Sequence, residues 1–165
     1  MSLFSVFRTK HVNVLLCGFD GVGKTSITLS LSGLNPSVFP PKPTFGYNSP
    51  TLHFSGVKWI FWDVCGQQKF RNLWRSYYKN VQCVAFVIDA TDTERFEDVK
   101  STLIAMINDQ ELKNCPFLVW VNKGHVDKLN ELPKNKVLVL DCDAMNGTGL
   151  KEGLKWLKKE VNPKK

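Results

Sequence analysis

One short segment limits what this chain can fold into more than any other. Gly18 to Thr25 reads GFDGVGKT and matches the pattern G-x-x-x-x-G-K-[ST]. The apolar run at residues 12–17 predicts a buried strand before it, and residues 24–31 predict a helix after it. This order of strand, loop and helix is the context in which the motif binds phosphate groups, and it argues against a chance match at a glycine-rich turn.

The residue types of this loop indicate its chemistry. Glycines let backbone N–H groups turn inward around a phosphate, and the N-terminus of the following helix adds partial positive charge. The Lys24 ammonium would bridge the β- and γ-phosphates, and the Thr25 hydroxyl would bind Mg²⁺. The motif therefore indicates a nucleoside triphosphate and leaves the base open. The predicted phosphate-binding residues are Gly18, Asp20, Gly21, Val22, Gly23, Lys24, Thr25 and Ser26.

Apolar runs alternate with helical patterns along the rest of the chain. Two strands are expected at residues 52–54 and 57–62, joined by a turn at Ser55-Gly56. Helices are expected from Phe96 and from Leu150, each with an apolar stripe. This alternation predicts an α/β fold, a mostly parallel sheet with helices on both faces, whose ligands bind at the carboxyl ends of the strands. The further strands are expected at residues 84–90, 117–121 and 137–140.

A second polar segment, Asp63-Val64-Cys65-Gly66-Gln67, ends the strand at residues 57–62. Asp63 can reach Mg²⁺ through a water, and Gly66 can bring its N–H close to a γ-phosphate because it has no side chain. Gln67 carries a donor and an acceptor, so it can orient an attacking water. Gln67 and Lys24 are the predicted catalytic residues. Alone, Asp63 would suit a strand-end cap, and the nearby phosphate loop favours the functional interpretation.

Thr44 lies in the loop between the first helix and the hairpin. It can reach Mg²⁺ and the γ-phosphate only while a triphosphate is bound, which would make this loop a switch. The spacing alone also fits an ordinary turn threonine after Pro43. The predicted metal ligands are therefore Thr25, Thr44 and, through a water, Asp63.

Together these segments resemble the small GTPases, and most closely the ADP-ribosylation factor family. The resemblance lies in GFDGVGKTS, PTFGYN, WDVCGQQKFRNLWRSYY, VIDATDTERF and EGLKWL. It implies a P-loop NTPase fold with a six-stranded sheet, GTP or GDP with Mg²⁺, and a cycle run by exchange factors and GTPase activators. It also implies effectors that contact Tyr47, Trp62 and Tyr77, and work in vesicle transport on intracellular membranes or on cytoskeletal and ciliary cargo.

The chain departs from the guanine motif of that family, Asn-Lys-x-Asp, and reads Asn122-Lys123-Gly124-His125. Asn122 is expected to tie the base loop to the phosphate loop, and the Lys123 stem to lie along the base. The missing carboxylate would accept two hydrogen bonds from guanine, each worth about 1.5–3 kcal/mol. A neutral imidazole has one acceptor and a protonated one has none. A reduced preference for guanine is expected, unless Asp127 substitutes through a shift of the loop.

The resemblance matches a last base-contacting segment to Asp143, Ala144 and Met145, where the Ala144 N–H would bind guanine O6. Cys65 stands where the family usually has glycine, so the backbone loses freedom there. A passive thiol is favoured over a reactive one.

Residues 1–10 are expected to form an amphipathic segment that makes weak peripheral membrane contact, and residues 11–165 the GTPase domain. Ser2 excludes N-myristoylation, which requires glycine there. Residues 151–165 hold six lysines and two glutamates. This basic tail fits an anionic surface or a solvated helix face, and no nucleic-acid-binding motif accompanies it.

The sequence thus predicts a monomeric, cytoplasmic Arf-like GTPase with slow intrinsic hydrolysis, since no arginine is placed as a built-in finger. A nucleotide-binding scaffold of the same fold that does not cycle is the alternative, and His125 and Cys65 motivate it. A P-loop kinase or ATPase is disfavoured, because it would need a lid with phosphate-binding arginines and the sequence has no such segment. The five cysteines show no C-x-x-C spacing, which favours reduced thiols. We expect neither a membrane span nor a secretory signal.

Overall fold

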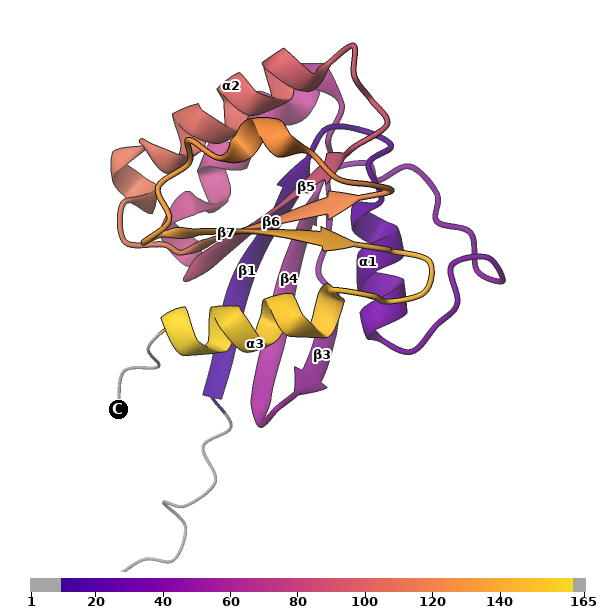
Figure 1. Cartoon of the computed structure of the whole chain (residues 1–165). Coiled ribbons are helices and arrows are strands. Elements are labelled where there is room, and N and C mark those ends of the chain that lie inside the picture. Colours follow the sequence, from indigo (N-terminus) through magenta and orange to yellow (C-terminus); the bar gives the residue numbers. More distant parts are fainter. Residues whose placement is uncertain (1–9, 162–165) are drawn as a thin grey trace, which may run out of the picture.

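The computed structural model describes residues 10–161. The amphipathic segment expected at residues 1–10 lies outside this range except for Lys10, with which β1 (Lys10–Gly18) begins. A central sheet runs through the molecule, and its parallel strands point the same way (Figure 1). The predicted α/β architecture is confirmed.

The sheet is parallel through its centre and antiparallel on one side. β1 pairs in parallel with β4 (Val57–Val64) and β5 (Cys83–Asp89). β6 (Phe117–Asn122) and β7 (Val137–Cys142) continue the parallel order beyond β5. All five strands therefore end at the same end of the sheet, where the loops that follow β1, β4, β6 and β7 carry the predicted motifs.

The antiparallel side explains why residues 10–161 contain seven strands where six were expected. β2 (Tyr47–Asn48) and β3 (Thr51–Phe54) both pair with β4, one after the other along its length. Pro50 lies between them and lacks the N–H that a continuous ladder needs. Its carbonyl still accepts from the Phe61 N–H at 2.9 Å. The arrangement is thus the expected six-stranded one, with a single strand interrupted.

Helices lie on both faces of the sheet (Figure 1). α1 (Lys24–Leu31) and α3 (Leu150–Glu160) contact each other on one face. The 3₁₀ helix η2 (Gln68–Asn80) and α2 (Phe96–Ile107) lie on the other face. Two short 3₁₀ turns, η3 (Gln110–Leu112) and η4 (Asp127–Leu129), complete the described elements. In the described part of the chain, no helix is long and apolar enough to cross a membrane.

The core is built from strands that are buried on both faces, as parallel strands usually are. Every residue of β6 is buried, and Trp59, Phe86 and Trp120 are among the largest enclosed side chains. α3 approaches β6 closely at Gly153, where an added Cβ would lie 2.6 Å from Leu118 Cδ2 and 2.7 Å from Trp120 Nε1. This packing fixes the sheet, and with it the positions of the loops at its carboxyl end.

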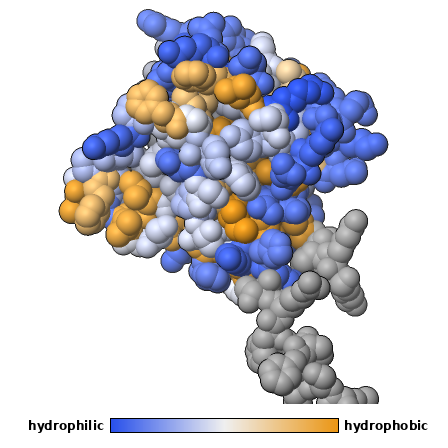
Figure 2. Space-filling view, turned by 180° about the vertical axis from the view of Figure 1, so that it is seen from behind, coloured by the Kyte–Doolittle hydropathy of each residue, from blue (hydrophilic) through white to orange (hydrophobic). Residues whose placement is uncertain are grey.

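The loop between α1 and β2 exposes apolar side chains. Figure 2 shows apolar patches on the side of the molecule toward which this loop projects. Its prolines restrict the backbone without adding regular structure, as expected for a surface loop. The exposed apolar residues of this loop are Leu34, Val38, Phe39 and Phe45.

Candidate functional site

The phosphate loop lies where the sequence predicts it, between the end of β1 and the start of α1. Gly18 and Gly23 have φ angles of 144° and 103°, which side chains other than glycine rarely adopt. Lys24 is buried at 7% exposure, and its ammonium donates to the carbonyls of Gly18 at 3.0 Å and Phe19 at 2.8 Å. Burial lowers the pKa of Lys24, although the Asp63 carboxylate opposes this effect. A polyphosphate beside it would favour its charged form.

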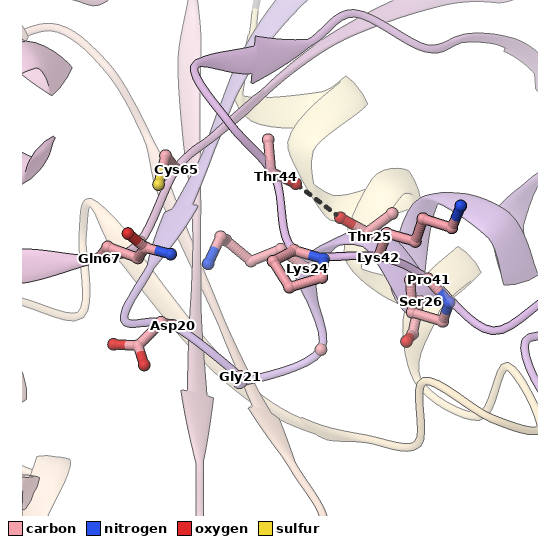
Figure 3. Close-up of a pocket in the computed structure, with 13 residues that line it drawn as sticks. Asp20, Gly21, Lys24, Thr25, Ser26, Pro41, Lys42, Thr44, Cys65 and Gln67 are labelled. Carbon is pink, nitrogen blue, oxygen red and sulfur yellow. Dashed lines mark hydrogen bonds between the residues drawn. The ribbon is translucent and has the colours of Figure 1, made fainter.

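The three predicted metal ligands come from three different segments and meet beside this loop. The Thr25 hydroxyl donates to Asp63 Oδ2 at 2.6 Å. It also lies 3.2 Å from the Thr44 hydroxyl (Figure 3). Asp63 is fully buried, and its Oδ1 has no hydrogen-bond partner among the described residues. Burial raises the pKa of Asp63, against the hydrogen bond from Thr25 and the charge of Lys24.

These oxygens fit Mg²⁺. The ion prefers hard oxygen ligands and usually binds through one or two protein groups together with substrate phosphates. A buried carboxylate oxygen without a partner is costly, and a cation or its bound water would satisfy it. Thr25, Thr44 and Asp63 could therefore hold the ion between the protein and a nucleotide.

A cavity of about 410 Å³ opens over the loop. Lys24 and Gln67 line it from opposite segments, and both side chains are directed into it (Figure 3). Pro41, Lys42 and Pro43 also line it; only their proximity to Thr44 in the sequence could have indicated this. The other lining residues are Asp20, Gly21, Gly23, Thr25, Ser26, Thr44, Cys65 and Gly66. The phosphate-binding prediction thus gathers in one place, apart from Gly18 and Val22, which do not line the cavity.

Gly66 packs directly on the phosphate loop. A Cβ at this position would lie 2.5 Å from Gly18 O, 2.6 Å from Phe19 C and 2.7 Å from Asp20 N. All three are backbone atoms that cannot yield by rotating a side chain, so only glycine fits this arrangement. Its N–H donates to no backbone carbonyl within residues 10–161.

The neighbouring Cys65 is accommodated without displacing this contact. Its N–H donates to Gly46 O at 2.9 Å, and its carbonyl accepts from the Trp74 indole at 2.8 Å. The thiol is buried in the wall of the cavity.

Asn122 ties the base loop to the phosphate loop, as predicted. Its side-chain amide donates to Val22 O at 3.0 Å, and its Oδ1 accepts from the Ala144 N–H at 3.0 Å. The N–H expected to bind guanine O6 is therefore held by Asn122 in this structure. Asp143 closes the same loop, because its Oδ1 accepts from the Met145 N–H at 2.7 Å.

Lys123 is held by a partner that the sequence analysis did not identify. Its ammonium donates to Asp89 Oδ2 at 2.7 Å, and its own backbone has a φ of 67°. Burial raises the pKa of Asp89, but the hydrogen bonds from Lys123 and Thr91 outweigh this and hold it below its usual value. The carboxylate ends β5 and therefore orients Lys123 from the neighbouring strand.

His125 lies between two carboxylates. Its Nδ1 is 2.7 Å from Asp141 Oδ2, and its Nε2 is 3.0 Å from Asp127 Oδ1. The hydrogen bond and charge of Asp141, followed by those of Asp127, raise the pKa of His125. Both ring nitrogens therefore act as donors when the ring is charged. Asp127 faces His125 rather than replacing it, and no local pattern indicated Asp141, which lies on β7.

Tyr47, Trp62 and Tyr77 come together as a triad. The three ring centroids lie 5.4 to 5.8 Å apart, within the range of aromatic pairing. Tyr47 is 49% exposed, and the Trp62 indole donates to Asn13 Oδ1 at 3.1 Å. The triad thus presents a partly exposed aromatic surface at the interrupted strand and η2.

Comparisons with known proteins give a consistent result. A model of the ADP-ribosylation factor family matches residues 1–161. ADP-ribosylation factor J of Dictyostelium discoideum is 32% identical over an alignment of 176 positions, which covers 99% of this chain and 93% of the relative. Among solved structures, the Arl6 BBS3 small GTPase of Trypanosoma brucei, with the bound nucleotide analogue GppNp, superimposes with a TM-score of 0.78. It is 28% identical and covers 92% of this chain and 98% of its own.

Proposed function

This chain belongs to the ADP-ribosylation factor family of GTPases, which bind GTP and GDP with Mg²⁺, and we propose that it is a slowly hydrolysing switch in vesicle-mediated transport. The observation that carries its switch role is the contact of Thr44 with Thr25, which in turn donates to Asp63, a carboxylate whose other oxygen has no hydrogen-bond partner in the described part of the chain. Thr44 belongs to a loop most of whose residues are exposed, and it lines the cavity, so it can respond to what fills the cavity.

We assign the hydrolytic roles from the cavity. Lys24 and the backbone N–H groups of the loop stabilise charge on the phosphates, and Gln67 orients the attacking water. When bound, Mg²⁺ neutralises phosphate charge. No arginine of the described residues lines this cavity. Intrinsic hydrolysis is therefore slow, and a partner supplies the missing positive charge in trans.

The switch loop and the aromatic triad lie on connected segments. Thr44 precedes β2, and Tyr47 begins it. Loss of the γ-phosphate would release Thr44 and so displace Tyr47 from Trp62 and Tyr77. Effectors that recognise the assembled triad would then bind the triphosphate form, while exchange factors and GTPase activators run the cycle. Residues 1–10 add weak peripheral contact with an intracellular membrane, and the protein acts as a cytoplasmic monomer.

The base site is predicted to favour guanine by a reduced margin. A charged His125 has no acceptor for the guanine N1 and N2 donors, so the acceptor of the family motif is missing. Asn122, Lys123 and the Asp143–Met145 loop are left to position the base.

Hydrolysis of GTP by the purified chain tests the proposal. Gln67→Leu should lower the Mg²⁺-dependent rate by about tenfold or more, because the side chain that orients the attacking water is lost. Gln68→Leu is the matched control, since Gln68 is the adjacent exposed glutamine and does not line the cavity. Equal rates for wild type and Gln67→Leu would reject the role of Gln67.

A nucleotide-bound scaffold that does not cycle is the second candidate. The carboxylates around His125 favour it, because they favour the charged ring, which offers guanine no acceptor. Thermal shift with GTP, ATP and xanthosine triphosphate separates the two functions. A switch gives selective stabilisation by GTP and turnover in the hydrolysis assay. A scaffold gives stabilisation without turnover.

A further inference from the structure

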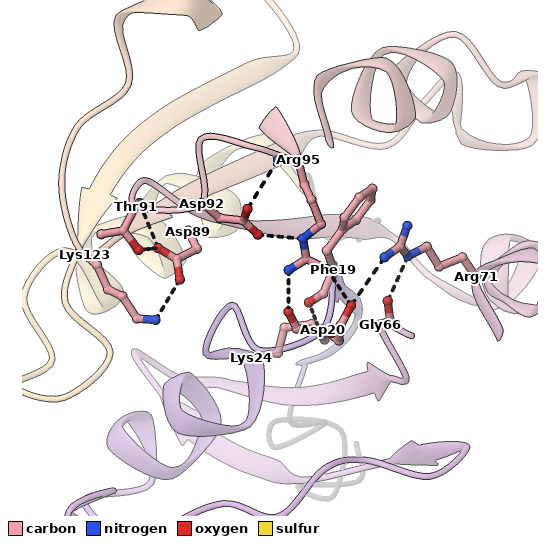
Figure 4. Close-up of polar contacts among 10 residues, drawn as sticks. All are labelled: Phe19, Asp20, Lys24, Gly66, Arg71, Asp89, Thr91, Asp92, Arg95 and Lys123. Atoms are coloured by element: carbon pink, nitrogen blue, oxygen red, sulfur yellow. Dashed lines mark hydrogen bonds and ion pairs between the residues drawn. The ribbon is translucent and has the colours of Figure 1, made fainter. Parts of the chain in front are cut away.

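Two arginines from different elements converge on Asp20 of the phosphate loop. Arg71 belongs to η2, and Arg95 directly precedes α2. Both bind Asp20 Oδ1, Arg95 at 2.8 Å and Arg71 at 3.4 Å (Figure 4). Asp20 lines the nucleotide cavity. These contacts therefore join η2 and the start of α2 to one residue of the phosphate loop.

Arg95 fixes Asp20 in place. Besides the carboxylate, its guanidinium donates to the Asp20 carbonyl at 3.0 Å, and its Nε donates to Asp92 Oδ2 at 2.7 Å. Arg95 thus has three partners, two of them on Asp20. Burial raises the pKa of Asp20, but the hydrogen bonds and charges of the arginines outweigh it and keep this carboxyl ionised.

Arg71 connects this fixed point to Gly66. Its Nε donates to Gly66 O at 2.8 Å, and its guanidinium carbon lies 3.3 Å from the centroid of the Phe19 ring. Stacking on an aromatic face and a charge-assisted hydrogen bond are both sensitive to the orientation of the guanidinium plane. Arg71 can make these contacts together only while Gly66 rests on the phosphate loop.

The carbonyl and the N–H of Gly66 differ in their contacts. Its carbonyl is held by Arg71, and its N–H donates to no backbone carbonyl in the described part of the chain. We propose that Arg71 is a positioning residue that holds Gly66 against the phosphate loop and thereby favours triphosphate over diphosphate binding. This inference rests on the proposed switch function, because it requires the Gly66 N–H to meet the terminal phosphate.

The proposal separates two ways in which Arg71 could matter. If Arg71 merely supported the fold, its loss would weaken the binding of both nucleotides alike. As a positioning residue for the contact with the terminal phosphate, it acts on the triphosphate and leaves the diphosphate nearly unaffected. The ratio of the two dissociation constants is therefore the informative measurement.

The experiment measures dissociation constants of the full chain for GppNp and for GDP, both with Mg²⁺. Arg71→Ala should weaken GppNp binding by about tenfold, which corresponds to about 1.4 kcal/mol, and GDP binding by no more than about threefold. Arg75→Ala is the matched control. It removes an arginine of the same helix that pairs with Asp109 at 2.6 Å, away from the phosphate loop. This control should leave both constants within about threefold of the wild type.

Arg71→Lys carries the test if Arg71→Ala proves unfolded by circular dichroism. Lysine keeps a positive charge near Phe19 and Asp20 but lacks the planar fork that also reaches Gly66 O. It should also lower the ratio of the GDP dissociation constant to the GppNp dissociation constant. Equal losses for both nucleotides, or an unchanged ratio in a folded variant, would overturn the proposal.

The outcome is independent of the proposed hydrolysis. A wild type that binds GppNp but does not hydrolyse GTP would refute turnover and leave the Arg71 comparison intact. A wild type that binds neither nucleotide would refute the switch function itself, and the inference with it.

Discussion

Replacing Asn122 with alanine should destabilise the fold strongly, because this side chain satisfies two buried backbone groups at once. Its amide donates to Val22 O, and its Oδ1 accepts from the Ala144 N–H, both at 3.0 Å. Asn122 is 3% exposed, while Val22 and Ala144 are each 2% exposed. A buried backbone group left without a partner costs about 1–3 kcal/mol, so the two together cost about 2–6 kcal/mol. This is a large part of the ~5–15 kcal/mol that holds a domain folded.

Urea unfolding of nucleotide-free protein measures the effect, since bound nucleotide would add its own contribution. Asn130→Ala is the control: it removes an exposed asparagine, and its effect should stay within about 0.5 kcal/mol. Asn122→Asp retains an acceptor toward Ala144 but presents an oxygen to the Val22 carbonyl, so it should also destabilise. A loss below about 0.5 kcal/mol for Asn122→Ala would refute the reasoning.

Three further outcomes are expected. The pKa of His125 is raised, mainly by Asp141, so the stabilising effect of the charged ring is complete below the unfolded pKa of 6.5 and disappears as pH rises through the higher folded pKa. The difference in unfolding free energy between wild type and His125→Asn should therefore shrink over that pH range, and a constant difference would contradict this. Gly153→Val should lower the unfolding free energy by about 1–3 kcal/mol, because its side chain would press on Trp120, and an unchanged melting temperature would argue against that contact. All five cysteines are buried, so alkylation should be slow in native protein and complete in urea; rapid native labelling would show an exposed thiol.

The phosphate half of the site was predictable because it is local. Gly18 to Thr25 is one strand–loop–helix unit whose chemistry depends on residue types at fixed spacing. Asp63 and Gln67 required one further step, since the ends of neighbouring parallel strands meet. The expected helices and strands were also found with similar bounds, because their apolar periodicity matches the surfaces that they bury.

The base half was predictable only in part. Asn122 and its tie to the phosphate loop followed from the resemblance, but the partners of Lys123 and His125 did not. Asp89 and Asp141 lie 34 and 16 residues away in sequence, and only the pairing of β5, β6 and β7 brings them together. A sequence pattern does not encode such contacts unless the register of the strands is already known.

The sequence pattern did not predict the helix η2, for another reason. Its two buried residues, Trp74 and Tyr78, are four apart, but the 3₁₀ geometry does not sustain the stripe by which an α-helix is recognised. The contacts of Arg71 with Phe19 and Gly66 depend on the path of this helix, so they were not foreseen either.

The interruption between β2 and β3 at Ser49 and Pro50 has a consequence for aggregation. β2 and β3 form one edge of the sheet, where unpaired backbone groups can recruit a strand from another copy. Two short runs separated by a proline cannot template a long intermolecular ladder. The interruption thus protects this edge of the sheet against self-association into cross-β aggregates.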